Sequence, residues 1–154
     1  MSSHSNILIH LVFSTKYRKR LLNEEWMEEL FSYIGGTIKE HKAVLLKAGG
    51  VEDHVHLLIR FHPQFAIAST IRLLKANSSR WINEANKMKV RFSWQSGYGA
   101  FTVSQSNIDK VHQYIGNQRE HHRQISFRDE YFELLKRHRI AFDEEFVFET
   151  EHSG

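Results

Sequence analysis

The feature that most restricts the fold is the order in which two apolar periodicities follow one another along the chain. Four segments have the pattern of strands, namely residues 6–15, 43–51, 54–61 and 91–104. Apolar residues at helical spacing separate them over residues 23–41 and 64–86. The resulting order, strand-helix-strand-strand-helix-strand, predicts an α+β fold: a ferredoxin-like (RRM-like) split βαβ antiparallel sheet with helices on one face.

Two further helical patterns follow the last strand, over residues 107–122 and 127–139. No linker rich in Pro, Gly or Ser and no repeat interrupts the 154 residues, a length that suits one domain with a real core. We therefore expect a single domain with a core of about residues 6–140. An acidic tail of about residues 141–154 completes it.

Composition excludes several classes of protein. The chain has no cysteine, which excludes disulfide scaffolds, thiolate zinc sites, iron–sulfur clusters and cysteine nucleophiles. No apolar stretch approaches the ~20 residues of a membrane-spanning helix. The polar N-terminus lacks the pattern of a signal peptide. These observations predict a cytoplasmic protein that does not enter a membrane.

Charge is unevenly distributed although the net charge is only +3. Residues 60–91 hold seven Lys and Arg against one acid, while residues 129–154 hold eight acids against three bases. A second basic run, Lys16–Arg20, places four cations around Tyr17. Such segregated positive charge with interleaved aromatic residues indicates a phosphate-bearing partner, although a solvated basic face explains charge alone equally well.

The strongest local motif is His54-Val55-His56 on a predicted strand. Residues two apart on a strand project from the same face, so the two imidazoles can converge on one metal ion. A buried histidine is more often a structural residue with satisfied hydrogen bonds, but a pair on one face raises the case for ligation. The pair alone is incomplete, because a metal ion needs further ligands.

A second group lies on the predicted helix 107–122. Tyr114 and Gln118 are four residues apart and share a helix face. A phenol there is often part of an amphipathic core, but it is also a competent nucleophile when a nearby cation or base lowers its pKa. Tyr98, between two glycines, is a rival nucleophile. His121 and His122 diverge around the helix, so we expect them to be exposed or to face phosphate.

Together these residues resemble the HUH single-tyrosine transposases of the insertion-sequence 200/605 family. The similarity spans about residues 6–140 in the same order, from Thr15-Lys16-Tyr17-Arg18 through Asp53, His54-Val55-His56 and Trp94-Gln95-x-Gly97-Tyr98 to Tyr114-Ile115-x-x-Gln118. The motif His-hydrophobic-His alone is weak, whereas the ordered set is specific. The acidic tail has no counterpart in the family pattern.

The resemblance implies a DNA transposase in which Tyr114 is the nucleophile. It also implies that His54, His56 and Gln118 bind a divalent metal, Mg²⁺ or Mn²⁺. These neutral ligands would leave positions open for phosphate oxygens and water. Attack by Tyr114 would give a 5′-phosphotyrosine and a free 3′-OH, so that cleavage can be reversed for rejoining without ATP.

The partners follow from the same resemblance: single-stranded DNA hairpins at the ends of an element in a bacterial or archaeal cell, and a second copy of the chain. Candidate DNA-backbone contacts are Lys16, Tyr17, Arg18, Arg20, Arg72 and Lys75. The family works as a homodimer, and the polar joint 104–107 permits exchange of the tyrosine helix. We therefore expect composite sites, with histidines from one chain and Tyr114 and Gln118 from its partner.

Three alternatives remain open. A non-catalytic RRM-like protein would bind single strands by stacking bases on exposed aromatic residues of its sheet. A domesticated relative would act on repeated palindromes. A small metal-dependent hydrolase would need carboxylates near the histidines, which the sequence does not place there. Only the transposase forms a covalent protein–DNA adduct, so a denaturing gel separates it from a binding protein and a hydrolase.

Overall fold

A computed structural model describes residues 1–85 and 87–148 of the chain. Four strands form one antiparallel sheet in the order β2-β3-β1-β4. Their bounds are β1 (Ile7–Ser14), β2 (Val44–Val51), β3 (His54–Phe61) and β4 (Gly99–Thr102). The expected mixed fold with a four-stranded antiparallel sheet is confirmed.

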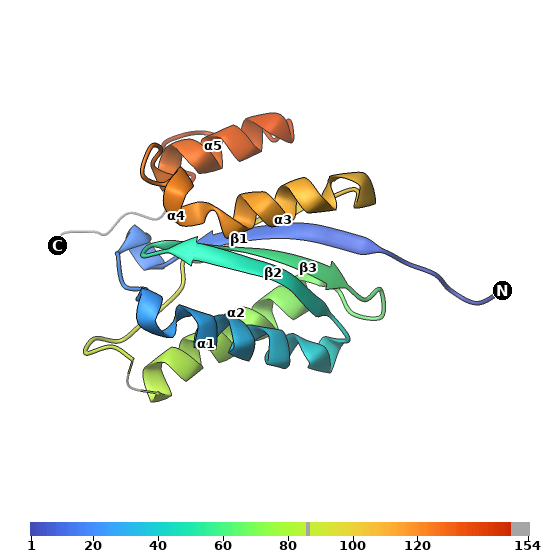
Figure 1. The fold of residues 1–154 in the computed structure, drawn as a ribbon, viewed down its shortest axis with the longest axis horizontal. Coiled ribbons are helices and arrows are strands. Elements are labelled where there is room, and N and C mark those ends of the chain that lie inside the picture. Colours follow the sequence, from blue (N-terminus) through green and yellow to red (C-terminus); the bar gives the residue numbers. More distant parts are fainter. Residues whose placement is uncertain (86, 149–154) are drawn as a thin grey trace.

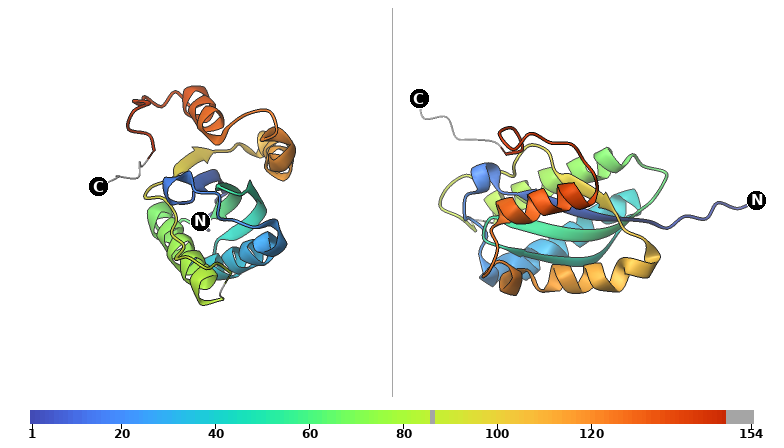
Figure 2. Two further views of the ribbon diagram at one scale, coloured as in Figure 1. Left: turned by 90° about the vertical axis from the view of Figure 1, so that its left-hand side faces the viewer. Right: turned by 90° about the horizontal axis from the view of Figure 1, so that it is seen from above.

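Helices cover both faces of the sheet (Figures 1 and 2). The first face carries α1 (Glu24–Thr37) and α2 (Ile67–Glu84), the two helices of the ferredoxin-like core. The opposite face carries the C-terminal helices α3 (Ile108–Gly116), α4 (Gln118–His121) and α5 (Phe127–Arg137). Short 3₁₀ segments span Lys16–Arg18, Ile38–His41 and Gln105–Asn107. None of the described helices is long and apolar enough to cross a membrane.

The alternation of side chains along the central strands gives the two faces different chemistry. One set packs in the core against α1 and α2 and consists of Ile9, Leu11, Phe13, Val55, Leu57 and Ile59. The other set includes His10, His54 and His56, all buried beneath the C-terminal helices. Because β1 and β3 are neighbours, with Val12 opposite His56, these histidines lie close together at the centre of the sheet. The fold thus buries a polar patch.

Three expected elements have different bounds in the structure. The helix expected over 64–86 begins only at Ile67. The last strand is reduced to Gly99–Thr102, because Phe92 instead bonds through its backbone N–H and C=O to the Asn83 side chain. The helix expected over 107–122 is divided at Asn117 into α3 and α4, where Gly116 and Asn117 are weak helix formers. This break decides where the next histidines point.

The beginning of the acidic tail packs on the molecule. Phe142, Val147 and Phe148 contact a second apolar cluster that includes Phe127 and Phe132. Apolar side chains from both sides of the expected boundary at residue 140 therefore pack in one cluster. Residues 141–148 contribute apolar side chains, whereas 149–154 lie outside the described residues.

Gly49 sets how closely the helix that carries Tyr114 approaches the sheet. A Cβ at Gly49 would lie 2.0 Å from the backbone oxygen of Ile115 in α3. We expect Gly49→Ala to force α3 away and to lower the free energy of unfolding by about 1–3 kcal/mol, as overpacking does. In the control Gly36→Ala, the new Cβ meets nothing within 4 Å, so stability should not fall. Urea denaturation measures both, and equal stability of the two variants would contradict this packing.

Candidate active site

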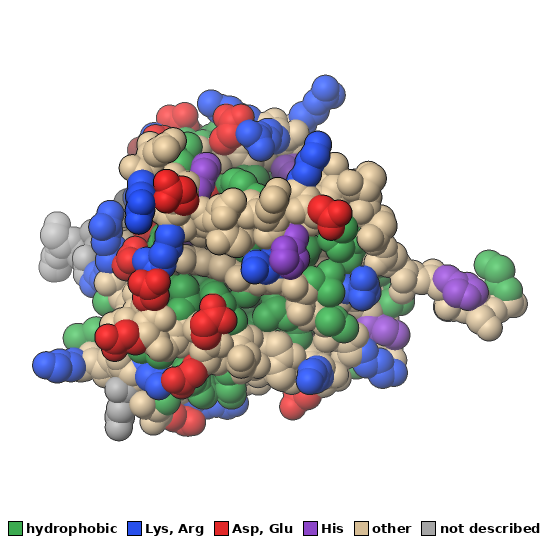
Figure 3. Space-filling view, viewed as in Figure 1, with side chains coloured by type: hydrophobic (Ala, Val, Ile, Leu, Met, Phe, Trp, Pro, Cys, Tyr) green, Lys and Arg blue, Asp and Glu red, His purple; other side chains and the backbone are tan. Residues whose placement is uncertain are grey.

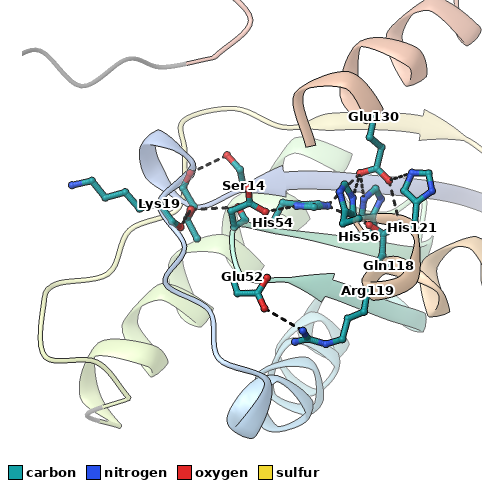
Figure 4. Close-up of polar contacts among 12 residues, drawn as sticks. Ser14, Lys19, Glu52, His54, His56, Gln118, Arg119, His121 and Glu130 are labelled. Atoms are coloured by element: carbon teal, nitrogen blue, oxygen red, sulfur yellow. Dashed lines mark hydrogen bonds and ion pairs between the residues drawn. The ribbon is translucent and has the colours of Figure 1, made fainter. Parts of the chain in front are cut away.

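The histidine face of the sheet and the C-terminal helices meet in one cluster (Figure 4). His54 and His56 come from β3, Gln118 begins α4, His122 follows α4, and Glu130 points from α5 toward the sheet. His54 and His56 have no exposed surface, and Glu130 is 2% exposed. Residues from β3 and from the C-terminal helices, which are far apart in the sequence, thus form one buried site.

Three imidazole nitrogens surround one carboxylate oxygen. Glu130 Oε1 lies 3.2 Å from His54 Nε2, 2.9 Å from His56 Nε2 and 3.0 Å from His122 Nε2. One potential ligand atom from each of these four residues lies within 4.8 Å of the others. Nitrogen and oxygen donors at this spacing are those that bind divalent metals.

The second nitrogen of each imidazole is already engaged. Nδ1 of His54 lies 2.7 Å from Asp53 Oδ1, and Nδ1 of His122 lies 2.8 Å from the carbonyl oxygen of Ile125. Both partners only accept, so both Nδ1 atoms carry hydrogen. His56 Nδ1 contacts His10 Nε2 at 2.7 Å. These bonds direct the Nε2 atoms toward Glu130.

A neutral imidazole with hydrogen on Nδ1 presents a lone pair at Nε2. In the cluster such lone pairs would face a carboxylate oxygen, so protons or a cation must lie between them. Outer hydrogen bonds of this kind also orient the histidine ligands of metal sites. The donor set therefore fits a divalent metal.

Electrostatics shift the cluster's pKa values in opposite directions. Burial alone would raise the pKa of Glu130, but the histidine hydrogen bonds outweigh it and lower the pKa far below the usual range. Burial would lower the pKa of His54, yet hydrogen bonds to Asp53 and Glu130 raise it above 6.5. Burial lowers the pKa of His56 to about 4. The low pKa of Glu130 keeps it ionised, and His54 holds a proton more readily than His56 does.

Tyr114 lies against the same carboxylate. Its hydroxyl donates a short hydrogen bond to Glu130 Oε2, and its ring centroid is 5.7 Å from that of His56. Gln118 Oε1 lies 3.2 Å from His54 Nε2. Burial first, and then the negative charge of Glu130, raise the pKa of Tyr114. The phenol is therefore protonated here, with an acceptor in contact.

The four central residues expected from the sequence, His54, His56, Tyr114 and Gln118, are thus brought together within one chain. The expected composite site, completed by a partner's tyrosine helix, stays a prediction for the homodimer. Within the joint 104–107, Gln105–Asn107 form a 3₁₀ segment, and the close approach of Ile115 to Gly49 packs α3 on the sheet of the same chain. Each chain contains a tyrosine, a carboxylate and the imidazoles.

The expectation that His121 and His122 are exposed or face phosphate is wrong for His122 and incomplete for His121. The break at Asn117 turns both toward α5. The His122 side chain is 9% exposed and its Nε2 contacts Glu130 Oε1. His121 is 32% exposed, with Nε2 3.2 Å from Glu130 Oε2. His122 therefore belongs to the candidate metal cluster.

The candidate DNA contacts divide into two places. Tyr17, Arg18 and Arg20 line a cavity of about 410 Å³ beside Asp53 and His122, and exposed Lys16 lies in the same 3₁₀ segment. Arg72 and Lys75 line a different cavity on α2, together with Tyr98. Lys75 Nζ donates to the carbonyls of Gln95 and Gly97, so it also fastens that loop. The basic run is thus the part next to the cluster.

Glu130 is a candidate site residue that the sequence motifs do not identify. Its signal is its position: it lies three residues after Phe127 and four before Leu134, on the buried side of α5. An acid on an apolar helix face needs partners, because a buried unpaired charge is costly. Two of its partners, His54 and His56, lie more than 70 residues away on β3, so helix periodicity could flag the acid but not identify these partners.

Metal binding should weaken as the pH falls, because a proton must leave His54 before its nitrogen can act as a ligand. Since the pKa of His54 is raised above 6.5, competition begins near neutrality and grows by up to about tenfold per pH unit below that pKa. His56, with a pKa of about 4, adds competition only in more acidic solution. Calorimetric titration with Mn²⁺ between pH 8.5 and 5.5 measures this. A constant affinity would contradict the assignment.

Comparison with known proteins places the chain beside transposases. A family model described as "Transposase IS200 like" matches residues 3–118. The transposase for insertion sequence element IS200 of Salmonella typhimurium is 29% identical over 120 residues, which cover 75% of this chain and 78% of that protein. The ISDra2 transposase TnpA of Deinococcus radiodurans is 28% identical over 116 residues, covering 72% of this chain and 83% of its own length.

Two solved structures resemble the fold. A crystal structure of a candidate transposase from Deinococcus radiodurans aligns with a TM-score of 0.61 and 28% identity, covering 77% of this chain and 95% of the other. A REP-associated tyrosine transposase bound to a REP hairpin aligns with a TM-score of 0.59 over 99% of this chain and 95% of the other. At 11% identity the second likeness concerns the fold alone.

Proposed function

The chain belongs to the IS200-like transposase family, and from this premise we propose that it cleaves and rejoins single-stranded DNA through a covalent bond to Tyr114. The observation that carries the proposal is the contact of the Tyr114 hydroxyl with Glu130, whose other oxygen is surrounded by three imidazoles. A nucleophile, a proton acceptor and candidate metal ligands thus share one buried cluster.

In the proposed reaction the Tyr114 oxygen attacks the scissile phosphorus and gives up its proton to Glu130, the acceptor it already contacts. The bond from phosphorus to the 3′-oxygen breaks, Glu130 passes the proton on to that oxygen, and the product strand leaves with a 3′-OH. The result is a 5′-phosphotyrosine, which the 3′-OH of another strand can attack to restore a phosphodiester and free Tyr114. Because the two bonds are equivalent in energy, no ATP is needed.

His54, His56 and Gln118 are the proposed metal ligands, and His122 and Glu130 lie where they can add to them. Bound Mg²⁺ or Mn²⁺ would supply Lewis-acid stabilisation of the charge on the phosphate oxygens. Asp53 and His10 hold the Nδ1 atoms of the two strand histidines and so orient both Nε2 atoms.

The proposed substrate is a single-stranded DNA hairpin from an element end, with the basic run as its backbone contact. Tyr17 and Arg18 both have positive φ, which costs a non-glycine residue roughly 1–2 kcal/mol. Arg18 Nε is buried and has no hydrogen-bond partner among the described residues. Backbone N–H groups of Leu21 and Leu22 donate to the carbonyl of Glu52, which secures the run beside the cluster. A DNA phosphate bound here would supply the hydrogen-bond acceptor that Arg18 Nε lacks.

The charge distribution on one face of the molecule supports a DNA contact confined to the basic run. On the face shown in Figure 3, acidic and basic side chains are interspersed and form no continuous basic patch.

A homodimer remains part of the proposal, because the sheet order leaves one edge of β2 and one of β4 unpaired within the described chain. Tyrosine and histidines of one chain lie together here, and exchange of the tyrosine helix between the subunits of that dimer would give the composite sites.

A non-catalytic RRM-like function is less well supported. That function needs a sheet face open to bases, whereas α3, α4 and α5 cover the face that bears His10, His54 and His56 (Figure 1). A domesticated relative acting on repeated palindromes would use the same chemistry and differ only in the DNA supplied.

The proposed function is tested by incubation with single-stranded oligonucleotides of the element ends and Mn²⁺, followed by a denaturing gel. A stable protein–DNA adduct is expected, and its absence would reject the proposal.

Binding should depend on salt through the basic run. Each Lys or Arg contact to a single-stranded phosphate adds about −0.7 to the slope of log affinity against log salt. We expect Arg18→Ala and Arg20→Ala each to make the slope less negative by about that amount. Lys39→Ala, which removes an exposed cation after α1, serves as control and should leave it unchanged. The slopes are measured by fluorescence anisotropy between about 50 and 300 mM salt, a range that includes physiological ionic strength. Identical slopes would remove the run from the interface.

A further inference from the structure

A cavity beside Tyr114 has no role in the reaction described above. Its volume is about 450 Å³, within the range of small-molecule sites, and residues of β4, α3 and α5 line it. We propose that this cavity binds one unpaired nucleotide of the DNA strand, next to the phosphate that Tyr114 attacks. The inference rests on the proposed function and adds a base-binding subsite to it.

Aromatic rings form much of the cavity wall. Phe101 of β4 stacks on His138 with centroids 4.6 Å apart and an interplanar angle of 26°. His10 lies edge-on to Phe101 at 6.3 Å and to Tyr114 at 6.0 Å. Phe101 and His10 are buried, so the exposed His138 is the ring on which a nucleobase of any identity can stack. Thr102 and Asn107 add polar groups to the lining.

The charge of the lining suits a nucleotide. Lys110 of α3 and Arg137 of α5 line the cavity from two different helices, and both side chains are exposed. No Asp or Glu is among the described residues that line it. A base stacked inside would therefore have its 5′- and 3′-phosphates within the field of two cations.

The cavity lies next to the histidine cluster and shares wall residues with a smaller cavity beside it. Tyr114, Leu134 and Arg137 also line a second cavity of about 110 Å³, whose other walls include His121 and Glu130. His10, in the wall of the larger cavity, contacts Nδ1 of His56 at 2.7 Å. A nucleotide held there would present its neighbouring phosphate to Tyr114, and the pocket would position the strand for attack.

The test uses a thymidine octamer with one internal 2-aminopurine, a base whose fluorescence falls when it stacks. The protein carries Tyr114→Phe, which keeps the ring and leaves the strand uncut. Titration in EDTA should quench the fluorescence. Lys110→Ala and Arg137→Ala should each weaken binding roughly fivefold, as loss of a phosphate contact does. Lys136→Ala, the neighbouring exposed cation outside the cavity lining, is the control and should bind as before.

A second variant tests the space rather than the charge. Val111→Met enlarges a half-buried side chain of the cavity wall without changing charge, and should reduce quenching at saturation and weaken binding at least fivefold. Circular dichroism checks that each variant is folded. Failure of the octamer to bind, or quenching unchanged in all three cavity variants, would overturn the proposal. The adduct assay with element ends is a separate readout: an adduct without quenching would reject the cavity and leave the transposase chemistry intact.

Discussion

Replacing Tyr114 by phenylalanine is expected to abolish the covalent protein–DNA adduct. The substitution removes one oxygen and leaves the ring, which packs edge-on to His10, His56 and His121. The fold and the affinity for uncut DNA should therefore change little. Loss of a nucleophile typically removes most of the rate enhancement, so the yield should fall at least about 1000-fold. A denaturing gel with end-labelled DNA measures the adduct, and anisotropy measures binding.

Tyr98→Phe is the matched control, because Tyr98 was the rival nucleophile of the sequence reading. Tyr98 is 39% exposed and lines the cavity on α2 with Arg72 and Lys75, apart from the histidine cluster. The adduct should form at the wild-type level in this variant. An adduct retained by Tyr114→Phe and lost by Tyr98→Phe would show that the nucleophile had been assigned to the wrong residue.

Periodicity identified the parts of the site that one strand or helix determines. The two-residue alternation of β3 placed Val55 and Leu57 in the core and both histidines on the other face, as the structure has them. The spacing of Tyr114 and Gln118 also pointed to proximity, although the helix breaks between them. The two residues nevertheless remain in contact: the Gln118 side-chain amide nitrogen lies 3.4 Å from the Tyr114 carbonyl oxygen.

What could not be predicted depends on packing between distant segments. The sequence shows Glu130 as one acid on an amphipathic helix, and only the placement of α5 over β3 makes it the centre of three imidazoles. His122 was expected on the surface, but it lies in the cluster because the helix is interrupted at Asn117. Phe142 and Phe148 of the acidic tail also pack on Phe132 of α5. Local patterns carry no information about these contacts.

Removal of an imidazole from the cluster should also reduce adduct formation strongly. We expect His56→Ala to reduce adduct formation at least about 100-fold, because a bound metal contributes several kcal/mol to stabilising a phosphoryl transition state and 1.36 kcal/mol corresponds to tenfold in rate. EDTA should have the same effect on the wild-type protein. His112→Ala, which removes an exposed histidine of α3 outside the cluster, is the control and should retain activity.

Metal binding provides a readout that is independent of cleavage. A ligand that binds only the folded state raises stability by RT ln(1 + [L]/Kd), about 2.7 kcal/mol at a concentration of 100 Kd. Mn²⁺ should therefore raise the melting temperature of the wild-type and His112→Ala proteins. It should do so far less in His56→Ala, since the remaining imidazoles and Glu130 offer fewer donors. Because His56 is fully buried, the metal-free melting temperature of each variant is measured first. Undiminished cleavage by His56→Ala in EDTA would contradict a metal-assisted reaction at this cluster.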